Sequence, residues 1–348
     1  ENLSKTLPVV RDFDNRTYIK EDAGKILVGI FEGNSIPAWD KTNKVPEDFS
    51  FGEFQENFEH FEPYLASAIK RFPVLETAGI RKFFSGPESF TPDTNTLLGE
   101  VPEVKNFFVC CGLNSIGIGS GGGVGKVTAE WLMTGHINED IFSYDIKRFQ
   151  KFHSELGFIK KRITESLGDL YGMHWPFKQH KTSRNIKTLP HHDNLKSFGA
   201  CFGVSGGYER PMWFALDGEK AEYQYSYNYQ SWYPSAEYET NNTIKNVGLF
   251  DLTPFSKFEI KSDKAYQELQ KICTANIKNE PGKCVYTHML NPDGGIETDL
   301  TVVCIENNYF RIISSAATRE RDKFHIKKYL SNDIELKDIT DDLCVFGL

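Results

Sequence analysis

The sequence lacks the long apolar runs and the paired-cysteine motifs that mark several classes of protein. No stretch of its 348 residues approaches the about 18 consecutive apolar residues that a membrane-spanning helix needs. Its first residues carry neither the basic nor the apolar region of a secretory signal peptide. Seven cysteines, an odd number, are scattered without a Cys-x-x-Cys pair, which argues against zinc and dithiol redox sites. A reducing compartment fits this usage best.

Motifs for nucleic-acid binding, metal binding and nucleophilic catalysis are also missing or weak. A formal net charge of −8 argues against nucleic acid as the main partner. No His-x-x-x-His or His-Glu-x-x-His pattern occurs, and the adjacent His191 and His192, with Asp193, fall in an expected loop where the side chains diverge. We therefore expect no metal site. There is no Gly-x-Ser-x-Gly elbow to hold a nucleophile.

What the sequence has instead is a stretch of sixteen residues, 111–126, that contains seven glycines. It lies between an apolar strand expected over 107–110 and a helix expected over 124–134, so its backbone N–H groups are free to meet a ligand at a helix start. A phosphate-binding P-loop is excluded, because Ser120 occupies the first glycine position and Val127 the hydroxyl position. The pattern favours a cofactor loop that resembles the last strand-loop-helix of a flavoprotein. A glycine-rich turn that only packs a helix on a sheet stays open.

The rest of the chain divides into an α/β part, a connector and an α+β part. Apolar and aromatic residues, at 39% and 14%, suffice for two or three cores. In the first part we expect strands over 17–21, 26–31 and 79–84, a helix within 54–72, and a loop over 86–95. The connector, residues 137–196, contains an expected helix over 146–167. In the last part we expect strands over 258–261, 284–290 and 300–306, and a helix over 264–273.

Residues 291–299 predict a hairpin that carries two carboxylates. The Pro-Asp-Gly-Gly turn reverses the chain, and strand alternation then places Glu297 and Asp299 on one face. A carboxylate that enters an apolar strand must be paired, protonated or functional. An ordinary hairpin with an exposed acidic edge is the equal alternative.

Together these segments resemble one family. Gly86-Pro-Glu-Ser-Phe-Thr-Pro-Asp93, the glycine loop and Ala129-Glu-Trp-Leu132 look like the C-terminal half of the FAD domain in sarcosine and dimethylglycine dehydrogenases. Tyr208-Glu-Arg-Pro-Met-Trp-Phe214, Phe250-Asp-Leu-Thr-Pro-Phe-Ser-Lys-Phe258 and the segment 289–301 resemble the fused domain related to the glycine-cleavage T-protein, which binds tetrahydrofolate. The likeness covers essentially the whole chain in the family's order, so the chain is expected to be an internal piece of a longer protein.

The resemblance implies three domains and a reaction. They are the C-terminal part of an FAD-dependent oxidoreductase domain (1–138), a central connector domain (139–196) and the N-terminal part of a T-protein-like folate domain (197–348). The implied reaction is oxidative N-demethylation of a small N-methylated amino acid. Hydride passes to FAD, and the iminium product is captured by tetrahydrofolate or hydrolysed to formaldehyde. The implied location is the cytoplasm in a bacterium and the mitochondrial matrix in a eukaryote.

The resemblance also implies site residues. The loop beside the flavin ring would comprise Leu113, Asn114, Ser115, Ile116, Gly117 and Ile118, whose N–H groups could stabilise negative charge on the reduced flavin. Asp299 matches the acidic position that meets the pterin of the folate and is the expected acid-base or orienting residue. Leu300 and Thr301 would line the same pocket, and Tyr18 falls near a substrate-contacting tyrosine.

Two departures leave an alternative open. Related monomeric amine oxidases anchor the substrate carboxylate with a lysine where this chain has Gly119, and attach flavin through a cysteine near Gly86, so neither device exists here. The regulatory subunit of pyruvate dehydrogenase phosphatase resembles the chain in the same motifs yet acts through protein contacts. Asp299 and the intact loop favour an enzyme over such a regulator. An electron-acceptor protein is a further candidate partner, and the oligomeric state is left open.

Overall fold

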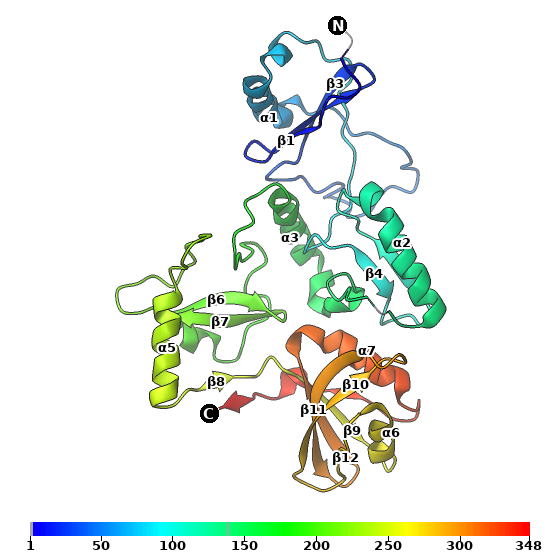
Figure 1. The fold of residues 1–348 in the computed structure, drawn as a ribbon, viewed down its shortest axis with the longest axis vertical. Coiled ribbons are helices and arrows are strands. Elements are labelled where there is room, and N and C mark those ends of the chain that lie inside the picture. Colours follow the sequence, from blue (N-terminus) through cyan, green and yellow to red (C-terminus); the bar gives the residue numbers. More distant parts are fainter. Residues whose placement is uncertain (1–2, 138) are drawn as a thin grey trace.

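The computed structural model describes residues 3–137 and 139–348, so the boundary expected at residue 138 lies outside the described residues. The N-terminal unit is a three-stranded antiparallel sheet with a helix beside it (Figure 1). Its elements are β1 (Val10–Asp12), β2 (Thr17–Asp22), β3 (Lys25–Ile30) and α1 (Phe58–Arg71). The β2–β3 hairpin confirms the expected strand pair, and its two-residue turn has positive φ at Ala23 and Gly24, typical of type I′.

Helix α1 begins after a side-chain cap at Asn57, and its rings pack against residue Phe83 of a segment that was predicted as a strand. The Asn57 side chain accepts a hydrogen bond from the His60 N–H at 2.9 Å, which sets the first turn. The strand expected over 79–84 is wrong, because these residues form no ladder. The Phe83 ring packs instead on two rings of α1, with centroid distances of 4.5 Å to Phe58 and 5.2 Å to Phe61.

The glycine loop joins a two-stranded antiparallel sheet to a long helix. The sheet is β4 (Leu97–Glu100) with β5 (Phe108–Cys111), and the helix is α2 (Gly117–Thr134). Helix α2 begins seven residues earlier than expected, so six of the seven loop glycines are helical. Its end was predicted correctly, since Gly135 forms a left-handed C-cap with φ of 76°. Glycine is a poor helix former, so these residues are helical against their local propensity.

The connector contains a shorter helix than the sequence predicts. The expected helix over 146–167 is broken into two 3₁₀ turns, Ile146–Arg148 and Lys151–Ser154, before α3 (Leu156–Asp169). Side chains explain the breaks, because Asp145 caps the first turn through the Lys147 N–H at 2.9 Å, and the Gln150 N–H bonds to the His153 ring at 3.0 Å. Each cap competes with a continuous helix.

The C-terminal unit confirms the α+β expectation. A hairpin of β6 (Ala200–Ser205) and β7 (Tyr208–Phe214) lies beside α4 (His192–Ser197) and α5 (Tyr233–Lys245). A five-stranded antiparallel sheet follows in the order β10-β11-β12-β9-β13. Its elements are β9 (Ser256–Lys261), β10 (Cys284–Leu290), β11 (Ile296–Glu306), β12 (Tyr309–Ser314) and β13 (Lys337–Asp338), with α6 (Ala265–Ile272) and α7 (Arg319–Tyr329). Near the C-terminus, β14 (Phe346–Gly347) pairs with β8 (Phe250–Asp251).

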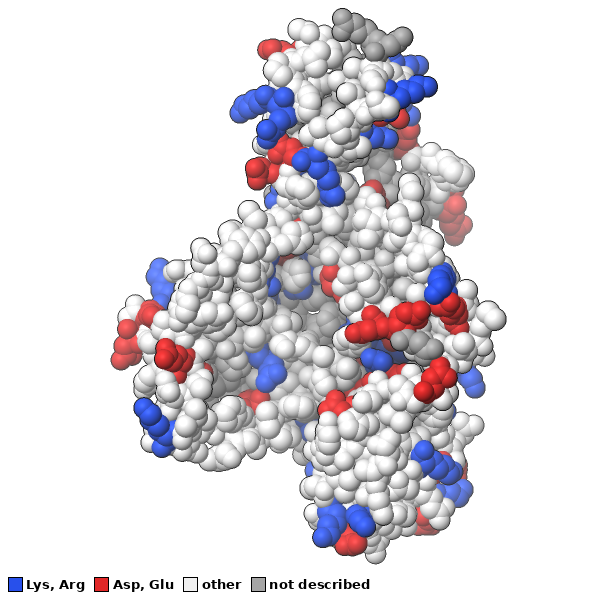
Figure 2. Space-filling model, viewed as in Figure 1, with Lys and Arg blue, Asp and Glu red and all other residues white. Residues whose placement is uncertain are grey.

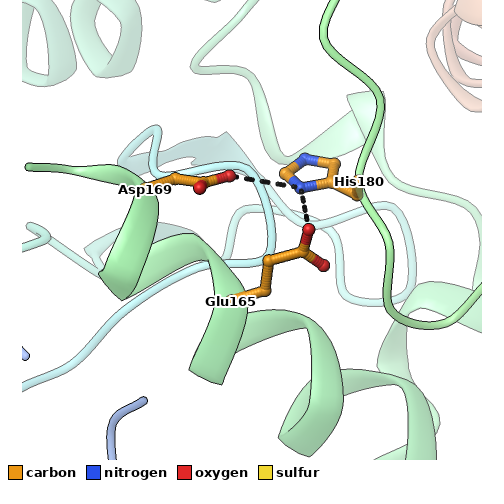
Figure 3. A group of neighbouring side chains, drawn as sticks. All are labelled: Glu165, Asp169 and His180. Atoms are coloured by element: carbon orange, nitrogen blue, oxygen red, sulfur yellow. Dashed lines mark ion pairs between the residues drawn. The ribbon is translucent and has the colours of Figure 1, made fainter. Parts of the chain in front are cut away.

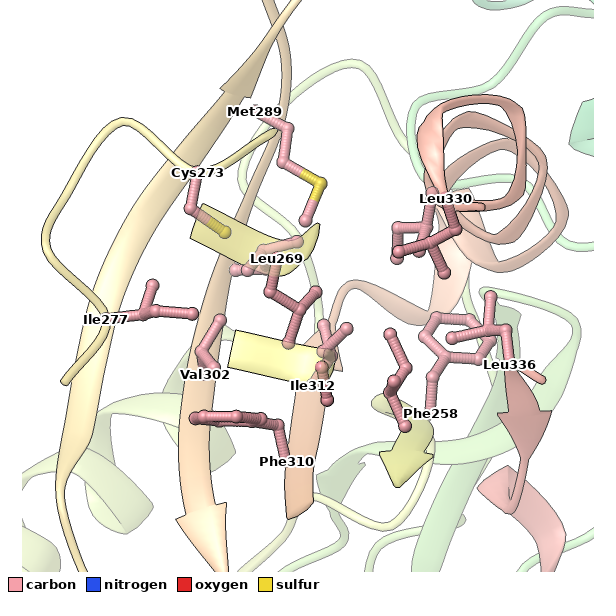
Figure 4. Close-up of a cluster of buried hydrophobic side chains, with 14 of the residues drawn as sticks. Phe258, Leu269, Cys273, Ile277, Met289, Val302, Phe310, Ile312, Leu330 and Leu336 are labelled. Atoms are coloured by element: carbon pink, nitrogen blue, oxygen red, sulfur yellow. The ribbon is translucent and has the colours of Figure 1, made fainter. Parts of the chain in front are cut away.

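The main hydrophobic core lies in this five-stranded sheet (Figure 4). Alternate residues of β9, β11 and β12 point to one face, where they meet α6 and the segment after α7. Members with no exposed surface include Phe258, Leu269, Val302, Phe310 and Ile312. This core gives the β10–β11 hairpin, which carries Asp299, a rigid base.

The surface and the helices agree with the charge and hydropathy of the sequence. Within the described ranges, no helix has the length and apolar character to cross a membrane. On the face shown in Figure 2, lysine and arginine side chains are interspersed with aspartate and glutamate. The expectation that nucleic acid is not a partner stays a prediction.

The packing of β4 against α2 depends on Gly99, which generates a stability prediction. Gly99 has φ of +105°, and an added Cβ would lie 2.2 Å from the buried Trp131 ring of α2. Gly24 also has positive φ, at +80°, but its Cβ would meet nothing within 4 Å. We expect Gly99→Ala to lower the free energy of unfolding by about 3 kcal/mol and Gly24→Ala by about 1 kcal/mol, measured by urea denaturation. Equal losses would show that contact with Trp131 is unimportant.

Candidate functional site

The glycine loop is held in shape by the side chain of Asn114. Asn114 is 2% exposed; its amide oxygen accepts the Thr91 N–H at 2.8 Å, and its amide nitrogen donates to the Gly112 carbonyl at 2.6 Å. Asn114 and Ser115 both have left-handed φ, at 50° and 64°. The loop therefore turns sharply between β5 and α2. It packs against the segment of residues 86–93, named here the 86–93 turn, through hydrogen bonds of Asn114 to Ser89 and Thr91.

The six residues expected to contact the cofactor, 113–118, differ in how exposed their side chains are. The Asn114 side chain is buried and bonds to Thr91 and Gly112, so its role is to shape the loop. Ser115, Ile116 and Ile118 are exposed, and Ile118 is completely so. The N–H groups in the first turn of α2 have no partner within the helix, and the helix dipole adds partial positive charge there. The loop thus offers an exposed, electropositive helix start, while its contact with a cofactor stays a prediction.

The structure brings Tyr18 towards the same region. Its ring lies over Gly29 of the neighbouring strand, where a Cβ would come 2.0 Å from the ring carbon Cζ. The pKa of the Tyr18 phenol is raised, first by burial, then by Tyr171 and by the negative charge of Glu88 on the 86–93 turn. Glu88 in turn bonds to Ser115 of the loop at 2.8 Å. Glu88 lies within the 86–93 motif, but no sequence pattern assigns it a role.

The second predicted site lies on the β10–β11 hairpin. Asp299 and Thr301 share the face of β11 opposite the core, and both Glu297 and Asp299 point to that face as expected. The expectation that Leu300 lines the same pocket does not hold for its side chain, which is 2% exposed and lies in the core. Neighbours in a strand point to opposite faces.

The two carboxylates of this face have different partners. Glu297 forms an ion pair with Arg321 of α7 at 2.7 Å. Asp299 is exposed and accepts a hydrogen bond from the Tyr286 hydroxyl at 3.1 Å. This bond is the first cause of a raised pKa at Tyr286. Tyr286 was not predicted as a site residue. Its position beside Asp299 follows from the hairpin register, in which Tyr286 faces Thr301.

A third cluster joins Glu165 and Asp169, one turn apart on α3, to His180 (Figure 3). The His180 Nδ1 lies 3.9 Å from an oxygen of each carboxylate. The Glu165 oxygen also accepts the Lys181 N–H at 2.7 Å, and the other oxygen of Asp169 pairs with Lys178 at 2.5 Å. Burial is the first cause of the lowered pKa of His180. We interpret the cluster as a clamp between α3 and the following loop, and the expectation of no metal stays a prediction.

The histidine pair considered as a metal ligand set lies elsewhere. The loop expected around it is wrong, because His192 and Asp193 begin the short helix α4 and His191 precedes it. The His192 ring packs on Phe202 with centroids 4.1 Å apart. His192 therefore contributes to the packing of α4 on β6.

Helix α2 connects the two predicted sites. It begins at the glycine loop, and its other end meets the C-terminal unit. The His136 Nε2 lies 2.7 Å from a carboxylate oxygen of Asp293 in the β10–β11 turn, and Lys328 of α7 donates to the Gly135 carbonyl at 2.8 Å. Positive charge at a helix C-terminus is favourable. One helix thus spans from the loop to the hairpin that carries Asp299.

The His136 contact generates a pH prediction. The pKa of His136 is raised, with the Asp293 hydrogen bond as first cause. The contact therefore stabilises the folded state fully below the usual histidine pKa, and this stabilisation is lost as pH rises through the raised pKa. We expect His136→Gln to lower the apparent Tm at pH 6 but much less at pH 9, with His174→Gln as control. A loss that is the same at both pH values would contradict this.

Comparison with known proteins places these sites in named domain families. Residues 1–131 match the FAD dependent oxidoreductase family, residues 134–188 the FAD dependent oxidoreductase central domain, and residues 191–348 the GCVT N-terminal domain. The three matches occur in the order expected from the sequence motifs. These domain types support FAD and tetrahydrofolate as cofactors.

Three curated relatives align over most of the chain. The 4-methylaminobutanoate oxidase (formaldehyde-forming) of Paenarthrobacter nicotinovorans is 39% identical over 92% of this chain and 39% of its own length. The mouse pyruvate dehydrogenase phosphatase regulatory subunit is 33% identical over 97% of this chain and 39% of its own. Human sarcosine dehydrogenase is 34% identical over 86% of this chain and 35% of its own. The chain thus spans less than two fifths of each relative. It belongs to the same family as these proteins, with an FAD dependent oxidoreductase domain, its central domain and a GCVT N-terminal domain in that order.

Proposed function

We propose that the full-length protein oxidises the N-methyl group of a small amino acid and passes the one-carbon unit to tetrahydrofolate. The observation that carries the proposal is the pair of predicted sites at the glycine loop and at Asp299, each in a domain of the matching type and joined through α2. Sarcosine, dimethylglycine and 4-methylaminobutanoate, named for relatives of this chain, are the substrates to consider.

The residues of the glycine loop fit a flavin. An added Cβ at Gly119, Gly121, Gly122 or Gly123 would meet no atom within 4 Å, so the first turns of α2 present bare backbone to whatever lies against them. The electropositive start of α2 would stabilise negative charge on a reduced ring. When bound, flavin supplies a two-electron acceptor for the hydride that leaves the N-methyl carbon.

The outer face of the β10–β11 hairpin fits a polar ligand. Asp299 is exposed, its carboxylate is oriented by the Tyr286 hydroxyl, and Thr301 adds a second hydroxyl two residues along the strand. A carboxylate held by one neutral donor keeps its charge and its remaining lone pairs for a ligand. Asp299 can therefore bind N–H groups of a pterin or accept the proton that a folate nitrogen loses when it bonds to the one-carbon unit.

Flavin reduction tests the oxidoreductase half of the proposal. We expect anaerobic addition of at least one of the three substrates to bleach the flavin absorption of the purified full-length protein. Bleaching would be absent with glycine, which lacks the N-methyl group. A protein that binds flavin but is reduced by none of the three would instead support the regulatory alternative, which the mouse relative represents.

Asp299→Asn tests the folate half. We expect flavin reduction to stay intact while formation of methylene-tetrahydrofolate falls by roughly a hundredfold, because an amide cannot exchange a proton as a carboxylate does. Glu306→Gln, at the exposed end of the same strand, is the matched control. Equal slowing of both reactions by Asp299→Asn would show that the two sites are not separate.

Tyr286→Phe tests the orientation of Asp299. The variant keeps the ring and removes the hydroxyl that donates to the carboxylate. We expect methylene-tetrahydrofolate formation to fall about threefold, a smaller loss than in Asp299→Asn, since the carboxylate remains. An unchanged rate would mean that this hydrogen bond does not position Asp299.

A further inference from the structure

Glu88 lies on the 86–93 turn, beside the loop that precedes α2. The family resemblance assigns this residue no role. Its Oε1 accepts a hydrogen bond from the Ser115 hydroxyl at 2.8 Å, and the side chain is exposed. Ser115 belongs to the loop expected to meet the cofactor. The carboxylate is thereby oriented at the edge of the predicted flavin site.

Tyr18, on β2, is a second predicted site residue that interacts with Glu88. The negative charge of Glu88 contributes to the raised pKa of the Tyr18 phenol, after burial and Tyr171, so the two groups lie near enough to interact. Tyr18, Glu88 and Ser115 thus lie near one another, although they belong to β2, the 86–93 turn and the loop before α2. None is near another in the sequence, so their approach is a property of the fold.

Glu88 differs from neighbouring carboxylates in having no positive partner. Asp93, on the same turn, binds Arg148 through two hydrogen bonds, and Asp12 binds Arg71 at 3.0 Å. Within residues 3–137 and 139–348, Glu88 pairs with no lysine, arginine or histidine, and the neutral Ser115 hydroxyl is its one hydrogen-bond donor. Its negative charge is oriented but not neutralised.

A substrate amine supplies the missing charge. An N-methyl amino acid is protonated at nitrogen near neutral pH, whereas loss of hydride from its methyl group needs the nitrogen lone pair to stabilise the cation that forms. A site for this reaction must therefore recognise an ammonium group and accept its proton. A carboxylate held 2.8 Å from a neutral donor retains lone pairs for both tasks.

We propose that Glu88 is the residue that binds the substrate ammonium and removes its proton, an inference that rests on the proposed function. In this step an N–H bond of the substrate breaks and an O–H bond forms on Glu88, the electron pair stays on nitrogen, and nothing is oxidised or reduced. Ser115 is a positioning residue that fixes the carboxylate. The site accordingly selects cationic N-methylated substrates over neutral ones of the same shape.

The test compares ligands of equal shape and different charge on the oxidised full-length protein by isothermal titration calorimetry. The pairs are trimethylammonioacetate with 3,3-dimethylbutanoate, and 4-trimethylammoniobutanoate with 5,5-dimethylhexanoate. We expect the wild type to bind the cationic member of the better pair at least about tenfold more tightly. Glu88→Gln should reduce the ratio to about threefold or less, without changing flavin content or the affinity for the neutral member. Glu103→Gln, an exposed carboxylate of the same domain, should behave as wild type.

Two results would overturn the proposal: a wild type without preference for the cation, or a Glu88→Gln variant that keeps the full preference. Ser115→Ala should lower the ratio less than Glu88→Gln, because the charge remains but its orientation is lost. The measurement involves no turnover. Failure of substrates to reduce the flavin would therefore reject the proposed function separately, whereas the ligand ratio decides the role of Glu88.

Discussion

The hydrogen bonds of one buried amide, Asn114, hold the predicted flavin site together. Its oxygen accepts the N–H of Thr91, and the Thr91 hydroxyl in turn bonds to the Asn95 carbonyl at 2.8 Å. Asp93, within this turn, binds Arg148 at the start of the connector. A continuous polar path therefore runs from the glycine loop through the 86–93 turn to the connector. Each buried member needs the next, because a polar group left without a partner there is costly.

This path explains how a loop rich in glycine can be ordered. Glycine gives the backbone freedom to turn at Gly112 and lets bare backbone line the start of α2, but it does not select one conformation. Asn114 favours the observed conformation, since its amide bonds to a donor on Thr91 and to an acceptor on Gly112 at the same time. The far end of α2 is fixed independently by Lys328 and His136. The helix is thus anchored at both ends, to the 86–93 turn and to the β10–β11 hairpin.

The sequence predicted the elements whose signals are local. The β2–β3 hairpin, the end of α2 at Thr134 and three of the five strands of the C-terminal sheet, β9, β10 and β11, each have a turn, a cap or an apolar alternation of their own. It failed where distant partners decide. Residues 79–84 have strand-like side chains, yet Phe83 packs on α1, and the glycines before Val124 are helical despite their propensity. The helix expected over 146–167 is broken by capping side chains whose effect depends on neighbouring turns.

The same distinction holds for the sites. Asp299 and the loop were predicted as site residues because they lie in recognisable motifs, and both stay predictions. The side chain of Leu300 lies in the core instead, because neighbours in a strand point to opposite faces. Tyr286 and Glu88 have no signal of their own, since one depends on hairpin register and the other on the approach of two loops. Predicting the register of the β10–β11 hairpin would have placed Tyr286 beside Asp299, whereas the position of Glu88 depends on the tertiary structure.

Hydrogen bonding separates the carboxylates that support the fold from those available to a ligand. Glu209 binds Arg184 through both oxygens, and Glu297 pairs with Arg321, so their charges are neutralised inside the protein. Asp299 and Glu88 are each oriented by a neutral hydroxyl. A hydroxyl fixes the direction of a carboxylate without cancelling its charge, which leaves the charge to attract a cation or a proton. The two proposed sites, one at the start of α2 and one on the hairpin whose turn contacts its far end, thus share one feature, an oriented and uncompensated negative charge.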